Sequence, residues 1–204
     1  MTDEKRQYRK GRRAKLEEAT RRRITESTIE LHGTIGPSAT SISAIAENAG
    51  VPRSTVYRHF PDERSLFAAC SAHWTASNPP PDLTGWAAIH DPDERLRVAL
   101  DELYAYYRRT ERMLSNLFRD EEQVPTVKKL FRGFRDYVDD ARDILCAGWP
   151  DRGLTGRRLR AATGHAVAFS TWRSLVREQG LEDAEATELV CRMVRATLEV
   201  GDRH

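Results

Sequence analysis

Residues 42–60 read ISAIAENAGVPRSTVYRHF, and this stretch decides the fold. Three of its apolar residues recur at the spacing of one helix face: Ile42, Ile45 and Ala46. Gly50 can adopt the positive φ that ends a helix within one residue. Pro52 suits the first turn of a following helix, where its missing N–H is not needed. The stretch therefore predicts two short helices joined by a sharp turn, at about residues 41–60.

The second predicted helix has one apolar and one polar face. Val56 and Phe60, four residues apart, are expected to point inward. The other side chains of this helix can donate hydrogen bonds to phosphates or to base edges: Arg53, Ser54, Thr55, Tyr57, Arg58 and His59. Any pair of helices can turn this sharply, but a polar outer face on the second helix is typical of a helix-turn-helix that reads DNA.

Residues on both sides of the pair support this interpretation. Thr40 is placed to cap the first helix, because a side-chain oxygen there can accept a hydrogen bond from a free backbone N–H. Pro61 and Asp62 form a corner after Phe60, from which a further helix is expected to begin at Glu63.

The run from about Ile24 to Trp74 resembles the DNA-binding domain of TetR-type transcriptional regulators. The residues that carry the resemblance are Thr40, Ile45-Ala46, Ala49-Gly50-Val51, Thr55-Val56-Tyr57-Arg58-His59-Phe60 and Leu66. Two positions depart from the family pattern, because Arg64 stands where a lysine is usual and His32 where a phenylalanine usually ends the first helix. Arginine still neutralises a phosphate, so Arg64 keeps that expected role, whereas His32 puts the packing of the first helix in question.

The exposed side of this helix is where the base sequence of DNA is expected to be read. Arg53 can bind the two acceptors of a guanine at once, and Ser54 and Thr55 can meet a base or a phosphate. Arg58 can do either. Four residues are expected to bind phosphates and so to set the register: Thr40, Tyr57, His59 and Arg64. For Tyr57 and His59 this role is implied by the resemblance.

The N-terminus carries a strong positive charge. Residues 1–23 hold ten Lys and Arg against four acids, which gives +6 there and −4 over the rest of the chain. Such a segment suits a polyanion, because neutralised phosphates release condensed counterions. The alternative is a merely soluble tail. Beside a helix-turn-helix we expect a basic arm in which Arg9, Arg12 and Arg13 reach the minor groove or flanking phosphates.

Apolar residues recur at helical spacing nearly throughout, so the 204 residues are expected to form an all-α protein of about nine helices. The first helix is expected at about 12–32 and the fourth at about 62–77. The run Asn78-Pro-Pro-Pro-Asp82 cannot continue a helix and predicts the domain boundary. Residues 1–78 would hold the basic arm and a three-helix DNA-binding domain with its linking fourth helix. Residues 79–204 would form a larger helical bundle.

Within the second domain, residues 83–89 are expected to be irregular. Asp91 is expected to cap a helix that begins at Pro92. The helices expected after it lie at about 113–118, 127–145, 161–176 and 186–197. The last two carry wide apolar stripes, which need a partner to cover them.

In the TetR-type family the two C-terminal helices usually pair with their copies in a second subunit as a four-helix bundle. The resemblance therefore implies a homodimer, although both helices can alternatively pack within one subunit. The residues expected at the dimer interface are Gly164, Ala168, Trp172, Leu189, Met193 and Thr197. A symmetric dimer would bind a palindromic double-stranded operator, with half-sites about one helical turn apart.

The resemblance also implies a small apolar or aromatic effector, whose binding releases a repressor from its operator. The residues expected to line its pocket are Trp74, Tyr104, Tyr107, Phe118, Phe131, Phe134, His165, Phe169 and Trp172. His165 would be a polar anchor on the buried stripe. The alternative is that these aromatic residues are simply core.

Catalysis and cofactors are not expected. The sequence has no catalytic or phosphate-binding motif of the common kinds, and its three cysteines are far apart, which argues against a zinc site or a disulfide framework. The acids from Asp136 to Asp143 lie three or four residues apart, but arginines lie close enough to pair with them. No segment resembles a signal peptide or a membrane span, so a cytoplasmic protein is expected. The alternative function is a helical interaction module without DNA binding, which would lack steep salt dependence on a duplex.

Overall fold

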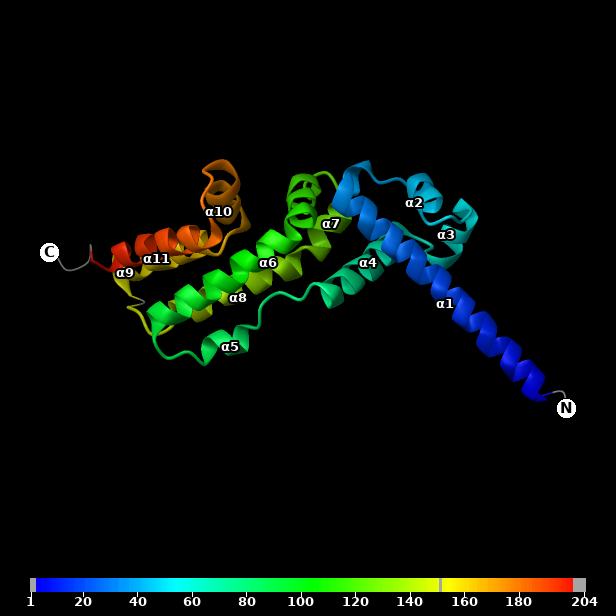
Figure 1. Cartoon of the computed structure of the whole chain (residues 1–204), viewed down its shortest axis with the longest axis horizontal. Coiled ribbons are helices and arrows are strands. Elements are labelled where there is room, and N and C mark those ends of the chain that lie inside the picture. The colour runs from blue at the N-terminus through cyan, green and yellow to red at the C-terminus, as the bar shows by residue number, and fades with distance from the viewer. Residues whose placement is uncertain (1–2, 151, 200–204) are drawn as a thin grey trace. The chain divides into compact units, whose positions relative to one another are not determined.

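The computed structural model describes residues 3–150 and 152–199, apart from the side chains of residues 3–6 and 9 (Figure 1). These residues form eleven α-helices and no strand, so the all-α prediction is confirmed. The described residues divide into two compact units, the first made of residues 3–78 and 112–131. The second unit comprises residues 79–111, 132–150 and 152–199.

The helices of the first unit are α1 (Asp3–Thr34), α2 (Ile42–Asn48), α3 (Arg53–His59), α4 (Glu63–Ser77), α7 (Pro125–Leu130) and the last residues of α6 (Pro92–Asp120). The helices of the second unit are α5 (Leu83–Ala87), the first part of α6, α8 (Arg132–Cys146), α9 (Gly153–Ala166), α10 (Phe169–Arg173) and α11 (Asp183–Glu199). Two further turns are a 3₁₀ turn at Pro37–Ala39 and a π-helical turn at Ser174–Glu178. Within the described ranges, no helix is both long enough and apolar enough to cross a bilayer.

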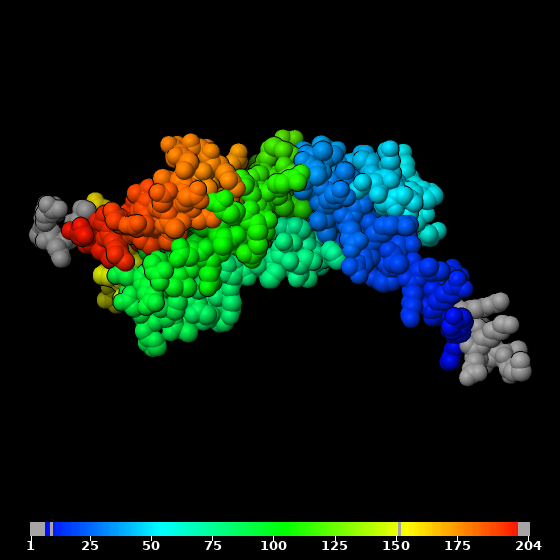
Figure 2. Space-filling view, in the orientation of Figure 1, coloured from blue at the N-terminus to red at the C-terminus, as the bar shows by residue number. Residues whose placement is uncertain are grey.

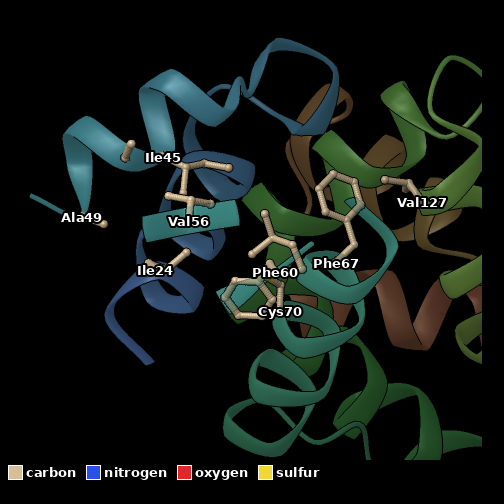
Figure 3. Close-up of a cluster of buried hydrophobic side chains, with 10 residues drawn as sticks. Ile24, Ile45, Ala49, Val56, Phe60, Phe67, Cys70 and Val127 are labelled. Atoms are coloured by element: carbon tan, nitrogen blue, oxygen red, sulfur yellow. The ribbon is translucent and has the colours of Figure 1, made fainter. Parts of the chain in front are cut away.

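The first unit is built on one apolar core (Figure 3). Its buried members are Ile24, Ile45, Ala46, Ala49, Val56, Phe60, Leu66, Phe67, Cys70 and Val127. They come from α1 to α4 and from α7, and burial of this apolar surface is what holds the short helices α2 and α3 in place. Val56 and Phe60 point inward as the sequence predicts.

The turn between α2 and α3 follows from Gly50. Its φ of 61° is accessible to glycine at little cost. The Gly50 N–H donates to the carbonyl of Glu47 at 3.0 Å, and the Val51 N–H donates to that of Ala46 at 2.9 Å. This pair of bonds is the Schellman motif, which satisfies carbonyls at the end of α2. The sharp turn predicted from Gly50 is therefore confirmed.

The cap of α2 lies one residue later than predicted. Ser41, not Thr40, precedes the helix, and its Oγ accepts from the Ala44 N–H at 3.1 Å. The Thr40 hydroxyl donates instead to the Gly36 carbonyl at 2.7 Å. Helix α4 begins at Glu63 as predicted, and Asp62 caps it by accepting from the Ser65 N–H at 2.7 Å. The cap predicted at Asp91 is confirmed, because Asp91 accepts from the Glu94 N–H at 2.7 Å.

Several helix boundaries in the later chain differ from those predicted. The short helix expected at 113–118 is the end of α6, which runs unbroken for 29 residues. The helix expected at 127–145 is divided at Phe131 into α7 and α8. Residues 83–87 are helical, because Asp82 caps them by accepting from the Thr84 N–H at 3.0 Å.

The helix expected at 161–176 is interrupted after Ala166. Tyr104 of α6 donates its hydroxyl proton to the Ala166 carbonyl at 3.0 Å, and Tyr107 donates to the Val167 carbonyl at 2.5 Å. In a continuous helix these carbonyls would accept from backbone N–H groups four residues later. The tyrosines therefore replace those bonds, and α10 starts in a new direction at Phe169 (Figure 1).

Candidate nucleic-acid interface

The polar face of α3 is open to solvent. Arg53, Ser54 and Arg58 are exposed, and Tyr57 has 49% of its surface accessible. Thr55 is half-buried. The helix thus presents a row of hydroxyl and guanidinium donors on one side while Val56 holds the other side in the core. This arrangement fits a helix that enters the major groove, where such donors meet base edges and phosphates.

His59 differs from the others on this face. It is half-buried, and its Nε2 atom is buried without a hydrogen-bond partner. A phosphate oxygen therefore cannot reach Nε2 in this conformation. The backbone of His59 is engaged as well, since its carbonyl accepts from Nη1 of Arg21 at 2.8 Å. The phosphate contact expected of His59 stays a prediction, and in this conformation Nε2 is not the atom that could make it.

Thr40 is also less suited to a phosphate than its sequence position indicates. Its single hydroxyl proton is donated to the Gly36 carbonyl. A phosphate oxygen can only accept hydrogen bonds, so Thr40 has no proton left for it. Ser41 is the better candidate, because it is exposed and its Oγ only accepts, which leaves its proton free. The sequence feature that could have identified Ser41 is its position directly before the first residue of α2.

Arg64 lies exposed in the first turn of α4, beside the Asp62 cap. Hydrogen bonds from the backbone and hydroxyl of Ser65, with the nearby Arg64 charge, lower the pKa of the Asp62 carboxyl. The capped helix start fixes the backbone of Arg64 next to the end of α3. A guanidinium on a fixed backbone is suited to a phosphate contact.

The basic N-terminus is helical where an arm was expected (Figure 1), and Figure 2 shows the same segment in space-filling form. Arg12 and Arg13 are exposed on the first half of α1, which extends beyond α2 and α3 in the first unit. Arg13 pairs with Glu17 at 3.0 Å. A helix about 10–12 Å wide does not fit a minor groove about 6 Å wide, so any contact there must come from the side chains of α1. Contact of these arginines with the minor groove or with flanking phosphates stays a prediction. The Arg9 side chain lies outside the described residues.

The residues expected to line an effector pocket are divided between the two units. Trp74, Phe118 and Phe131 belong to the first unit. The others lie in the second unit: Tyr104, Tyr107, Phe134, His165, Phe169 and Trp172.

In the second unit the aromatic residues gather around Tyr107. Its ring centroid lies 5.4 Å from that of Phe169, 6.1 Å from that of Trp172 and 6.5 Å from that of Phe134. Tyr104 and Tyr107 are fully buried, with both hydroxyls engaged at the end of α9. In this state they are core residues.

His165 was expected on a buried stripe, but it is exposed. The helix ends one residue later, so the 161–176 face on which that expectation depended does not exist. Its ring contacts the Thr171 hydroxyl, with Nδ1 at 3.2 Å.

The residues expected at the dimer interface have different environments. Trp172 is 0% exposed in the single chain and donates its indole N–H to Asp183 at 2.9 Å, so it has no surface to offer a second subunit. Gly164 faces α8 of its own chain, where an added Cβ would lie 3.3 Å from Cδ of Arg142. Leu189 and Met193 of α11 are 40% and 50% exposed. The remaining two residues are half-buried: Ala168 and Thr197.

Two acids of α8 pair with arginines; the spacing in the sequence predicts the pairing with Arg142, and Arg160 of α9 adds a contact that it does not predict. Arg142 lies 2.6 Å from Asp139 and 3.1 Å from Asp143, and Arg160 lies 2.6 Å from Asp143. In the part of the chain that the structure describes, no group of three His, Cys, Asp or Glu residues is arranged to hold a metal ion.

Comparison with known proteins gives one family match. Residues 24–70 match the family described as bacterial regulatory proteins, tetR family. This segment includes α2, α3 and the whole apolar core of the first unit except Val127. No curated protein matches the chain.

Solved structures similar to this chain include several regulators. A TetR-like transcriptional regulator from Rhodococcus sp. RHA1 is 20% identical, with a TM-score of 0.61, and the match covers 88% of this chain and 96% of that one. The fatty acid degradation regulator FadR from Bacillus halodurans is 16% identical, with a TM-score of 0.57, over 91% and 97% of the two chains. The regulator PfmR from Thermus thermophilus is 17% identical, with a TM-score of 0.54, over 88% and 99%.

Identities this low show the shared fold, while the family match covers the helix-turn-helix itself. The open polar face of α3 agrees with that match. Residues 24–70 thus match the helix-turn-helix domain of the tetR family of bacterial regulatory proteins, and the chain that carries them is a DNA-binding transcriptional regulator.

Proposed function

We propose that the protein is a homodimeric repressor that binds a palindromic operator through two copies of α3. The observation that carries the proposal is the exposed row of Arg53, Ser54, Tyr57 and Arg58 on a helix whose other face is fixed in the core. Arg53, at the first position of α3, would read a guanine, and the other three would meet bases or phosphates. We expect the regulator to act in the cytoplasm, where bacterial DNA lies.

Support for a dimer comes from α11. Leu189 and Met193, four residues apart on one face, leave much apolar surface open to solvent. An apolar stripe on a helix face is typical of a surface that packs against another helix. A second copy of α11, related by a two-fold axis, would cover this stripe and present two α3 helices to one duplex.

We further propose that a small apolar or aromatic molecule controls the repressor, as in the family. FadR from Bacillus halodurans is described as a fatty acid degradation regulator, which supports an apolar effector class for this chain. The aromatic cluster around Tyr107 offers apolar surface in the second unit, but it is closely packed. Effector binding there would require these side chains to rearrange. The role proposed for the chain is binding, without catalysis.

Selection from a random pool of duplexes tests the proposal. The wild-type protein should enrich a palindromic sequence, bind it far more tightly than a scrambled duplex of the same composition, and lose affinity steeply as salt rises. Failure to enrich any sequence, together with flat salt dependence, would contradict the proposal and favour an interaction module without DNA binding.

A further inference from the structure

Arg21 of α1 makes two contacts with the end of α3. Its Nη1 donates to the His59 carbonyl at 2.8 Å, and its guanidinium carbon lies 4.2 Å from the centroid of the Phe60 ring. Arg21 is half-buried, and Phe60 is part of the apolar core of the first unit. One side chain from the first helix thus holds both the last residue of α3 and the residue that follows it.

The end of α3 needs such a partner because the chain supplies none locally. At Phe60 the backbone leaves the helical conformation, with φ −135° and ψ 93°. Pro61 follows and has no N–H with which to continue the helix. Carbonyls at the end of a helix need a donor from elsewhere, and a positive charge is favourable at this end of the helix dipole. Arg21 supplies both.

The chemistry of this contact requires arginine. A planar guanidinium can donate to the carbonyl and lie over the Phe60 ring at the same time. A lysine in the same place keeps the charge, but its single ammonium group lacks the flat surface and the forked donors. The substitution Arg21→Lys would therefore change the geometry of the contact while leaving the charge the same.

The position of α3 matters because the helix has only seven residues. A binding group must be held within about 10–20° of its productive direction. The Gly50 turn fixes the start of α3 and Val56 its middle, and Arg21 fixes its end by a polar bond. We propose that Arg21 is a positioning residue for DNA reading, which sets the direction in which α3 presents Arg53 and Tyr57 to the bases. This inference rests on the proposed operator binding.

The test compares Arg21→Lys with Arg23→Lys. Arg23 is exposed on the same turn of α1, so the control makes the same substitution away from α3. The probes are a duplex enriched by the wild-type protein from a random pool and the same duplex with its bases scrambled. For Arg21→Lys we expect the ratio of the two Kd values to fall about tenfold, with the slope of affinity against salt unchanged because the charge is kept. Arg23→Lys should retain the wild-type ratio.

Hydrogen exchange gives the local measurement. In Arg21→Lys the amides of Tyr57 to Phe60 should exchange faster, while those of α4 and α8 keep their wild-type rates. An equal rise in every helix would show a role in overall stability and would overturn the inference. Equal Kd ratios for Arg21→Lys and Arg23→Lys would overturn it as well.

Arg21→Gln is the second variant, should Arg21→Lys fail to fold. Glutamine can donate a hydrogen bond but has neither the charge nor the flat guanidinium, so the Kd ratio should fall here too. A wild-type ratio in this variant would overturn the inference. If the wild-type protein itself enriches no sequence, the proposed function fails first, and that result does not depend on any Arg21 variant.

Discussion

At the scale of single residues, His32 is a polar side chain buried in an apolar environment. It is 6% exposed, its Nε2 has no hydrogen-bond partner, and its ring meets the edge of Phe67 with centroids 4.7 Å apart. Burial lowers the pKa of His32 to about 4, although the charge of Asp120 opposes this shift. The folded protein therefore keeps the ring neutral at pH values where the unfolded chain protonates it.

We expect this histidine to make the protein less stable in acid. Between pH 6.5 and pH 4 the unfolded chain binds a proton that the folded state does not. The free energy of unfolding therefore decreases as the pH is lowered through this range, by about 3 kcal/mol at most. His32→Phe should remove that contribution and raise stability at neutral pH by about 1 kcal/mol, because an unpartnered polar atom is lost. Urea unfolding across this pH range measures the difference between the two proteins. If the free energy of unfolding changed with pH by the same amount in both proteins, His32 would not be the source of the acid sensitivity.

Ser41 offers a second test at this scale. Ser41→Ala removes the cap of α2 and should lower the free energy of unfolding by about 1 kcal/mol. It should also weaken binding to cognate and scrambled duplexes alike, because a phosphate donor is lost. Thr40→Val is the matched variant. If Thr40→Val weakens binding and Ser41→Ala does not, Thr40 is the phosphate ligand after all.

At the scale of the elements, α3 and the start of α4 should make two different kinds of DNA contact. Arg53→Ala should relax sequence preference and cost about 1–3 kcal/mol on the enriched duplex, since its contact is to a base. Arg64→Ala should weaken all duplexes alike and reduce the salt slope by about one, since its contact is to a phosphate. Gel-shift titrations on cognate and scrambled duplexes measure both. Equal losses on both duplexes for both variants would reject this division.

The break between α9 and α10 provides another test. Tyr107→Phe leaves the buried Val167 carbonyl without its hydroxyl donor and should destabilise the protein by about 1–3 kcal/mol. Tyr8→Phe, on an exposed tyrosine of α1, is the control and should have no effect. Thermal unfolding gives the comparison. Unchanged stability in Tyr107→Phe would mean that the hydrogen bond from Tyr107 to the Val167 carbonyl does not stabilise the break between α9 and α10.

These two elements also mark how far the sequence predicts the structure. The turn after α2 depends on Gly50, whose signal is local, and the polar face of α3 follows from the spacing of Val56 and Phe60. The break after Ala166 has no local signal, because the hydroxyls that stabilise it lie about sixty residues earlier in the chain. The same holds for Arg21, which looks like one more basic residue of the N-terminus until the fold brings it to His59.

At the scale of the whole molecule, the division into units differs from a simple cut at Asn78. Residues 112–131 belong with the first unit, so its core includes Val127 from a segment far along the chain. The proline run at 79–81 marks where the chain leaves the first unit, which composition can predict. The chain re-enters the first unit at residue 112, within α6. The helical pattern is continuous there, so the sequence gives no signal of a boundary between units.

Assembly should depend on the exposed apolar stripe of α11. A wild-type homodimer should scatter light with twice the mass of the chain at micromolar concentration. Replacing Leu189 and Met193 together by Glu places two charges on this stripe and should give a monomer. Each monomer would then bind one half-site without a second subunit joined to it, so the affinity for the palindromic duplex should fall by about a hundredfold or more. Leu130→Glu, at an exposed leucine of α7, is the control and should remain a dimer. A monomeric wild-type protein that still binds the palindrome tightly would refute the two-fold arrangement, because a single α3 cannot read both half-sites at once.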